Sequence, residues 1–171
     1  MVMERPDILV TDASVLINFL AVDRLDLIAA HPSRCLVTDH VASEIAEHYP
    51  DQQLRYAAGL ASGAIHQIAV SASDEIELFS QLTATRRLGT GECSAIALAI
   101  CRQYRIAIDD KQACKQALAL RPDLQIISTQ DLVVEIVRAG RLDVASADAL
   151  KMRWQSEFSF ALKIRSFADV L

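Results

Sequence analysis

The sequence predicts an α/β protein with a mostly parallel central sheet that is covered by helices on both faces. Short apolar runs alternate along the chain with segments whose apolar residues recur at helical spacing. Some runs, such as residues 8–10, are continuously apolar, which is typical of strands buried on both faces. The chain has 171 residues and 52% hydrophobic content, which fits one domain with a sizeable core. We therefore expect a single domain over residues 1–171, with a core at about 7–140 and a helical, apolar extension at 141–171.

The elements are expected in a regular order along the chain. Each expected strand is a short apolar run, and these runs are residues 8–10, 35–38, 65–70, 105–108 and 124–128. Each expected helix has apolar residues three and four positions apart, and these helices are residues 14–21, 23–30, 40–48, 52–61, 74–88, 93–101, 111–117 and 132–139, with another from 146 onward. The alternation requires crossover connections between parallel strands.

Polar residues predict several helix ends. Asp39 follows an apolar run and is the expected N-cap of the next helix. Arg86 and Arg87 are expected in the last turn of their helix, where positive charge interacts favourably with the helix dipole. Ser128 and Asp131 have the spacing of a capping box, which gives Asp131 a structural role.

Composition limits the classes of function. A formal charge of −5 argues against a protein that coats nucleic acid through a broad basic face. No apolar stretch approaches the roughly 18 residues that span a bilayer, so we expect no membrane association. Glu4 and Asp7 precede the first apolar run, which is unlike a secretory signal, and we expect a cytoplasmic protein. The cysteines lie in apolar contexts without close pairing, as reduced thiols do: Cys35, Cys93, Cys101 and Cys114.

Acidic residues recur where strands end or helices begin. Asp12 follows the first apolar run, Glu44 lies about one turn into a helix, and Glu92 begins the most apolar helix of the chain. Asp109 and Asp110 directly follow the expected strand at 105–108, and we favour Asp110 for the site because adjacent side chains alternate in direction. The carboxyl ends of parallel strands share one edge, so we expect these acids to meet there.

A cluster of carboxylates indicates a particular chemistry. Like charges in one pocket repel and raise one another's pKa, so such a cluster is kept mainly where cations neutralise it. Hard oxygen ligands favour Mg²⁺ or Mn²⁺ over Zn²⁺. One or two such ions activate water and stabilise the leaving oxygen of a phosphodiester.

The same residues resemble the PIN domain family, from about residue 8 to residue 140. The motifs that carry the likeness are Asp12-Ala13-Ser14, Glu44, Gly91-Glu92 before an alanine-rich helix, and Asp109-Asp110. That family consists of metal-dependent nucleases and includes the VapC-type toxins of toxin–antitoxin pairs, while the tail resembles a PIN-like subgroup of predicted nucleic-acid-binding proteins. The resemblance implies a three-layer α/β/α fold, an antitoxin partner, metal ligands at Asp12, Glu44, Glu92 and Asp110, and an orienting role for Ser14. Ile108 and Asp109 stand where many relatives have Thr and Asn, so either aspartate can be the ligand.

We therefore predict an Mg²⁺- or Mn²⁺-dependent endoribonuclease that leaves a 5′-phosphate and a 3′-hydroxyl. The expected phosphate contacts are Arg86, Arg87, Lys111 and Lys115. The alternative is a catalytically silent module that binds nucleic acid or an antitoxin. A receiver domain requires a lysine after its last core strand, and a haloacid-dehalogenase-type phosphatase requires an aspartate at Ser14; the chain has neither. The aromatic residues of the tail either pack over the core or form the surface of a homodimer or of another partner, and the high apolar fraction also suggests a dimer.

Overall fold

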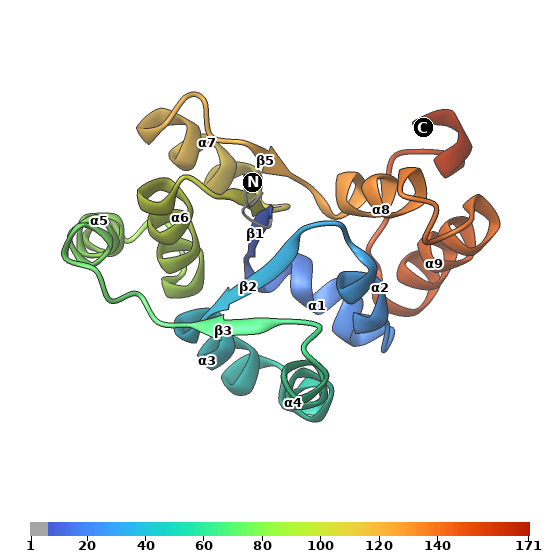
Figure 1. The fold of residues 1–171 in the computed structure, drawn as a ribbon, viewed down its shortest axis with the longest axis horizontal. Helices are drawn as coiled ribbons and strands as arrows, with labels where there is room; N and C mark the ends of the chain where they lie inside the picture. Colours follow the sequence, from blue (N-terminus) through green and yellow to red (C-terminus); the bar gives the residue numbers. More distant parts are fainter. Residues whose placement is uncertain (1–6) are drawn as a thin grey trace, which may run out of the picture.

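Five parallel strands form the centre of the computed structural model, which describes residues 7–171 (Figure 1). The strands are β1 (Ile8–Thr11), β2 (Arg34–Thr38), β3 (His66–Ile68), β4 (Arg105–Ala107) and β5 (Ile126–Ile127). Their order in the sheet is β3-β2-β1-β4-β5, and every neighbouring pair is parallel. This arrangement confirms the predicted fold class.

The helices lie on both faces of the sheet and explain why its central strands are continuously apolar. Figure 1 shows α5 (Ser73–Ala84), α6 (Thr90–Arg102) and α7 (Lys111–Leu120) on one side of the sheet. On the other side lie α1 (Ala13–Ala21), α2 (Leu25–Ala30), α8 (Thr129–Arg138) and α9 (Val144–Phe158). The chain steps from β1 to β2 to β3 and then crosses back to β4, and right-handed crossovers in opposite directions place their helices on opposite faces.

Two further helices and two 3₁₀ turns complete the fold. α3 (Asp39–His48) contacts both α1 and α6, and it is followed by the 3₁₀ turn η1 (Pro50–Gln52) and by α4 (Gln53–Ser62). Gly63 ends α4 at a φ of 77°, as its position after an apolar segment predicts. The turn η2 (Phe167–Asp169) lies near the end of the chain.

The strand register places several polar residues at one edge of the sheet. Thr11, the last residue of β1, pairs with Val37 on one side and Ala107 on the other. The next residue, Asp12, donates its backbone N–H to the carbonyl of Ala107 at 3.2 Å. The carboxyl ends of β1, β2 and β4 therefore lie side by side, as the functional prediction requires.

Two of the helix ends predicted from polar residues are different in the structure. Thr38, not Asp39, caps α3: its Oγ1 accepts from the backbone N–H of Val41 at 3.1 Å, and its hydroxyl is fixed by Ser94 Oγ at 2.6 Å. Because the buried Ser94 bonds to the Thr38 hydroxyl, this hydroxyl is held in the position that caps α3.

The second difference concerns α5, which ends at Ala84 instead of continuing to residue 88. Arg86 takes a left-handed conformation with a φ of 54°, and its N–H bonds to Thr83, so Arg86 and Arg87 lie in the connection to α6. The chain has to reverse there because α5 packs against α6, the next helix along the chain. The positive charges of Arg86 and Arg87 are compatible with the last turn of a helix or with the connection after it, so they do not predict where α5 ends.

The inner face of α5 carries a charged residue. Glu75 is 2% exposed, whereas the neighbouring apolar residue Ile76 is 47% exposed. Glu75 is buried because it forms an ion pair with Arg102 and accepts from the backbone N–H groups of Ser71 and Ala72. A charged residue with these partners can occupy a buried position.

The C-terminal segment packs over α1. Trp154 of α9 is fully buried between Phe19 and Phe160, with ring centroids 5.5 and 5.6 Å away in edge-to-face geometry. Phe167 is also buried, and Ser166 Oγ donates to Asp148 Oδ2 at 2.6 Å. The aromatic residues of the tail therefore serve mainly intramolecular packing.

All four cysteines are free thiols, and burial raises the pKa of Cys35 to about 12 and that of Cys93 to about 11. Within residues 7–171, no helix has the length and apolar character needed to cross a membrane.

Candidate functional site

Asp12 is the most deeply buried acid at the carboxyl edge of the sheet. It follows β1 and caps α1, and its Oδ1 accepts from the backbone N–H of Val15 at 3.0 Å. Ser14 Oγ lies 2.9 Å from Oδ1 and 2.8 Å from Oδ2, so this hydroxyl fixes the rotation of the carboxylate. Burial, together with the charges of Asp109 and Glu92, raises the pKa of Asp12 to about 7 in spite of these hydrogen bonds.

Glu44 reaches the site from α3 and meets the start of α6. Its Oε1 accepts from the backbone N–H of Gly91 at 2.7 Å. A Cβ atom at position 91 would lie 2.5 Å from Glu44 Oε2, which is closer than real contacts allow. Glycine at position 91 is therefore required for Glu44 to occupy this place.

Glu92 lies beside Glu44 in the first turn of α6. Its Oε2 accepts from the backbone N–H of Gly89 at 2.9 Å. A Cβ atom at position 89 would lie 3.1 Å from Glu44 Oε1 and 3.7 Å from Glu92 Oε2, so both carboxylates flank one point. Burial raises the pKa of Glu92, and the charges of Asp110 and Glu44 add to that effect.

The two aspartates after β4 have different partners. Asp110 caps α7, since its Oδ1 accepts from the backbone N–H of Ala113 at 2.8 Å. Asp109 accepts from the backbone N–H of Thr129 at 2.8 Å, from Thr129 Oγ1 at 2.6 Å and from Asn18 Nδ2 at 3.1 Å. The charge of Asp109 contributes to the raised pKa of Asp12, and the charge of Asp110 contributes to the raised pKa of Glu92.

Asn18 and Thr129 are site residues that the sequence motifs do not predict, and both contact Asp109. Asn18 is a polar residue in a helix whose neighbouring positions Phe19 and Leu20 are fully buried. A polar residue beside buried ones is the only local indication that Asn18 has a special role. It does not predict the hydrogen bond to Asp109, which lies 91 positions away in the chain.

The acids fit a divalent cation in their chemistry. All the donors are carboxylate oxygens, the set preferred by Mg²⁺ and Mn²⁺, and a cation would offset the burial of these charges and their mutual repulsion, which together raise the pKa of Asp12 and Glu92. In the described part of the chain, however, no three His, Cys, Asp or Glu side chains are already arranged as a coordination shell. The carboxylates are close enough to interact electrostatically, and their oxygens are turned toward backbone N–H groups.

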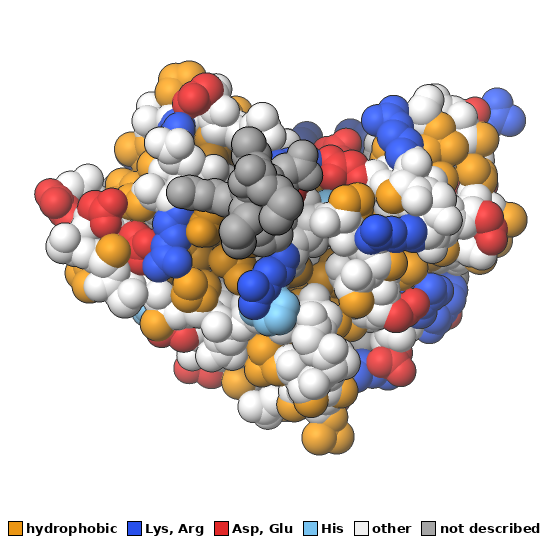
Figure 2. Space-filling model, viewed as in Figure 1, with side chains coloured by type: hydrophobic (Ala, Val, Ile, Leu, Met, Phe, Trp, Pro, Cys, Tyr) orange, Lys and Arg blue, Asp and Glu red, His pale blue; other side chains and the backbone are white. Residues whose placement is uncertain are grey.

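The cationic residues expected near the site are solvent-exposed. Lys111 and Lys115 lie on the first two turns of α7, directly after Asp110, and Arg86 and Arg87 lie just before Gly89. On the face drawn in Figure 2, the basic side chains of residues 7–171 are scattered among acidic and apolar ones. This distribution agrees with the net charge of −5.

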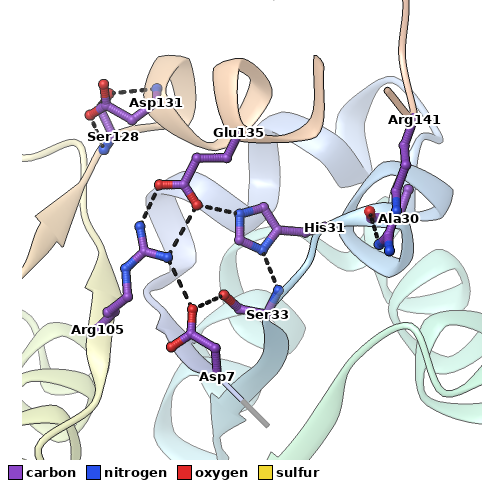
Figure 3. Close-up of polar contacts among 9 residues, drawn as sticks. All are labelled: Asp7, Ala30, His31, Ser33, Arg105, Ser128, Asp131, Glu135 and Arg141. Atoms are coloured by element: carbon purple, nitrogen blue, oxygen red, sulfur yellow. Dashed lines mark hydrogen bonds and ion pairs between the residues drawn. The ribbon is translucent and has the colours of Figure 1, made fainter. Parts of the chain in front are cut away.

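A separate polar network lies at the opposite edge of the sheet, where the strands begin (Figure 3). Glu135 of α8 forms an ion pair with Arg105 and lies 2.9 Å from Nε2 of the buried His31. Arg105 also reaches Asp7 at 3.3 Å, and Asp7 accepts from Ser33 Oγ at 2.6 Å. These bonds connect the starts of β1, β2 and β4 to α8, so the network stabilises the fold at a distance from the acids.

The charges in this network are set by burial and by pairing. Burial lowers the pKa of His31, although Glu135 opposes the effect. Burial alone would raise the pKa of Glu135, but the hydrogen bonds from Arg105 and His31 bring it below its usual value. A hollow of about 480 Å³ also lies at this edge and is lined by Arg102, Arg105 and Arg121.

An α/β protein with acids at the carboxyl edge of a parallel sheet belongs to a class that binds its ligands there. A PIN domain family model matches residues 8–161. The chain therefore belongs to the PIN domain family, as the sequence motifs indicated. The match extends beyond residue 140 and includes α9.

Several solved structures are similar to the chain. A PilT N-terminus domain protein of Sulfolobus solfataricus P2 is 14% identical, with a TM-score of 0.49 and coverage of 80% of this chain and 94% of that one. VapBC2 of Rickettsia felis, bound to a DNA fragment from its promoter, is 14% identical, with a TM-score of 0.49 and coverage of 71% and 98%. A toxin–antitoxin complex from Klebsiella pneumoniae is 15% identical, with a TM-score of 0.47 and coverage of 70% and 96%. No curated protein matches this chain.

Proposed function

We propose that this chain is a metal-dependent endoribonuclease that hydrolyses RNA phosphodiester bonds and acts as the toxin of a toxin–antitoxin pair. The observation that supports the proposal is the meeting of Asp12, Glu44, Glu92, Asp109 and Asp110 at one sheet edge in a PIN-family chain. A carboxylate cluster of this kind is expected to require cations.

The residues that would hold Mg²⁺ or Mn²⁺ are Asp12, Glu44, Glu92, Asp109 and Asp110, and either of the two aspartates after β4 can be the ligand. A bound divalent ion supplies a more acidic water molecule and charge stabilisation for the phosphodiester. Ser14 orients Asp12 by bonding to both of its oxygens. Gly91 lets Glu44 approach the start of α6, where the helix N-terminus favours negative charge.

The exposed cations would bind the RNA backbone. Lys111 and Lys115 continue directly from Asp110 on α7, while Arg86 and Arg87 precede the turn that carries Glu92. Phosphate contacts of this kind position a nucleic acid without reading its sequence. Cleavage by water with this arrangement leaves a 5′-phosphate and a 3′-hydroxyl.

The proposed partner is a cognate antitoxin protein, because the PIN domain family includes the VapC-type toxins of toxin–antitoxin pairs. We place the protein in the cytoplasm, where free thiols such as those of this chain persist. A homodimer is part of the same proposal, and Met152 and Phe158 on α9 are apolar side chains exposed for such contacts.

A second candidate is a catalytically silent module that binds RNA or an antitoxin. One observation favours it: in residues 7–171 the acids are turned toward backbone N–H groups and form no ready coordination shell. Such a module would engage its partner without cleaving RNA.

An RNA cleavage assay distinguishes the two candidates. The protein is incubated with Mn²⁺ and a mixed pool of structured RNAs, and the new 5′ ends are mapped and tested for phosphate. We expect discrete cuts with 5′-phosphate ends from the wild type and none from Asp12→Asn. Glu47→Gln, which alters an exposed acid of α3, is the matched control and should cut like the wild type. RNA binding without cleavage would favour the silent module, and equal cleavage by Asp12→Asn would refute the site.

A further inference from the structure

Asn18 connects the acidic site to the C-terminal part of the fold. Its side-chain Nδ2 donates to Asp109 Oδ2 at 3.1 Å and to Thr129 Oγ1 at 3.0 Å. Its backbone carbonyl accepts from Trp154 Nε1 at 2.7 Å. One residue of α1 thus contacts the loop after β4, the start of α8 and the middle of α9.

Asp109 depends on these contacts for its orientation. Thr129 donates to Oδ1 through its backbone N–H and to Oδ2 through its hydroxyl, and Asn18 supplies the third donor, to Oδ2. Donors on both carboxylate oxygens leave the group little freedom to rotate. Because Asp109 also acts electrostatically on Asp12, its orientation sets part of the field at the most buried acid of the site.

Trp154 holds Asn18 from the other side. The last carbonyls of a helix lack partners within the helix, and those of α1 find them elsewhere. The carbonyl of Phe19 accepts from the N–H of Arg24, and those of Leu20 and Ala21 accept from Arg55. The carbonyl of Asn18 accepts from Trp154, whose indole has a single donor and is fully buried.

We propose that Asn18 is a positioning residue of the acidic site, which holds the Asp109 carboxylate together with Thr129 and is itself held by Trp154. This inference rests on the proposed metal-dependent function. Residues that orient ligands through hydrogen bonds commonly change metal affinity by about 10- to 100-fold when they are removed. The C-terminal helix α9 is then a part of the site's architecture as well as a cover for the core.

Calorimetric titration with Mn²⁺ tests the proposal without measuring activity. Asn18→Ala removes the amide donor, and we expect its Mn²⁺ affinity to fall by about 10- to 100-fold. Thr129→Val should weaken binding in the same way, whereas Thr129→Ser, which keeps the hydroxyl, should bind like the wild type. Trp154→Phe removes the indole N–H that bonds to the Asn18 carbonyl, together with part of the ring. Because Trp154 does not contact Asp109 itself, we expect a smaller loss of Mn²⁺ affinity than in Asn18→Ala.

A matched control separates positioning from general stability. Ser166→Ala removes one hydrogen bond to Asp148 in the C-terminal segment and should not change Mn²⁺ affinity, whatever its effect on the unfolding temperature. Wild-type affinity in Asn18→Ala would overturn this inference and leave the proposed function intact. An equal loss in Ser166→Ala, or a failure of Thr129→Ser to bind better than Thr129→Val, would also overturn it. A wild type that binds no Mn²⁺ would overturn both the proposed function and the inference.

Discussion

Asp12→Asn is predicted to stabilise the metal-free protein at neutral and alkaline pH. The folded state raises the pKa of Asp12 from 3.8 to about 7, mainly by burial. Between these two pH values the folded protein keeps a proton that the unfolded chain releases, so stability falls as the pH rises through this window. A tenfold change in proton affinity corresponds to about 1.4 kcal/mol, so above pH 7 the buried charge lowers the free energy of unfolding by about 4 kcal/mol.

Asparagine removes that charge while keeping an oxygen that can accept from Val15. It loses charge-assisted bonds with Ser14 and Val15, so we expect a net gain of about 2 kcal/mol at pH 8. For a protein of this size the gain corresponds to about 4–8 °C in the unfolding temperature. Thermal unfolding with EDTA at pH 5 and pH 8 provides the assay, and the gain should shrink at pH 5, where the wild-type carboxyl is protonated. A variant that is less stable than the wild type at pH 8 would refute the reasoning.

Three other predictions concern separate parts of the molecule. Gly91→Ala should displace Glu44 and lower RNA cleavage at least tenfold, whereas Gly63→Ala, at a φ of 77°, should cost about 1 kcal/mol of stability without changing cleavage; equal cleavage in both would be contrary to this. His31, whose pKa is lowered, binds protons more readily in the unfolded chain, so stability should fall below about pH 6.5; pH-dependent denaturation should show a weaker fall in His31→Gln. Lys115→Ala should raise KM for RNA with little change in kcat and reduce its salt dependence, and an unchanged KM would remove Lys115 from the RNA-binding surface.

The sequence was sufficient to predict the sheet and the placement of acids at its edge. Continuous apolar runs mark strands buried on both faces, and the parallel arrangement brings their carboxyl ends together. Asp12 follows such a strand, and Gly91-Glu92 begins a helix that is buried on nearly all sides. These relations are local or follow from the fold class, so a single sequence reveals them.

Other features depend on contacts that a single sequence does not encode locally. Thr38 caps α3 in place of Asp39 because Ser94, 56 positions away, fixes its hydroxyl. α5 ends at Ala84 because the chain reverses there so that α5 packs against α6. The hydrogen bond from Asn18 to Asp109 joins two segments that are far apart in the chain, and the sequence of neither segment predicts the contact.

The acids at the carboxyl edge are proposed to bind a divalent cation, and Mn²⁺ titration by calorimetry measures this binding without an RNA substrate. The wild type and Asp12→Asn are compared at pH 8, where the wild-type carboxylate is ionised. We expect saturable binding to the wild type and binding at least tenfold weaker to the variant. Equal binding to both proteins, or binding to neither, would contradict it.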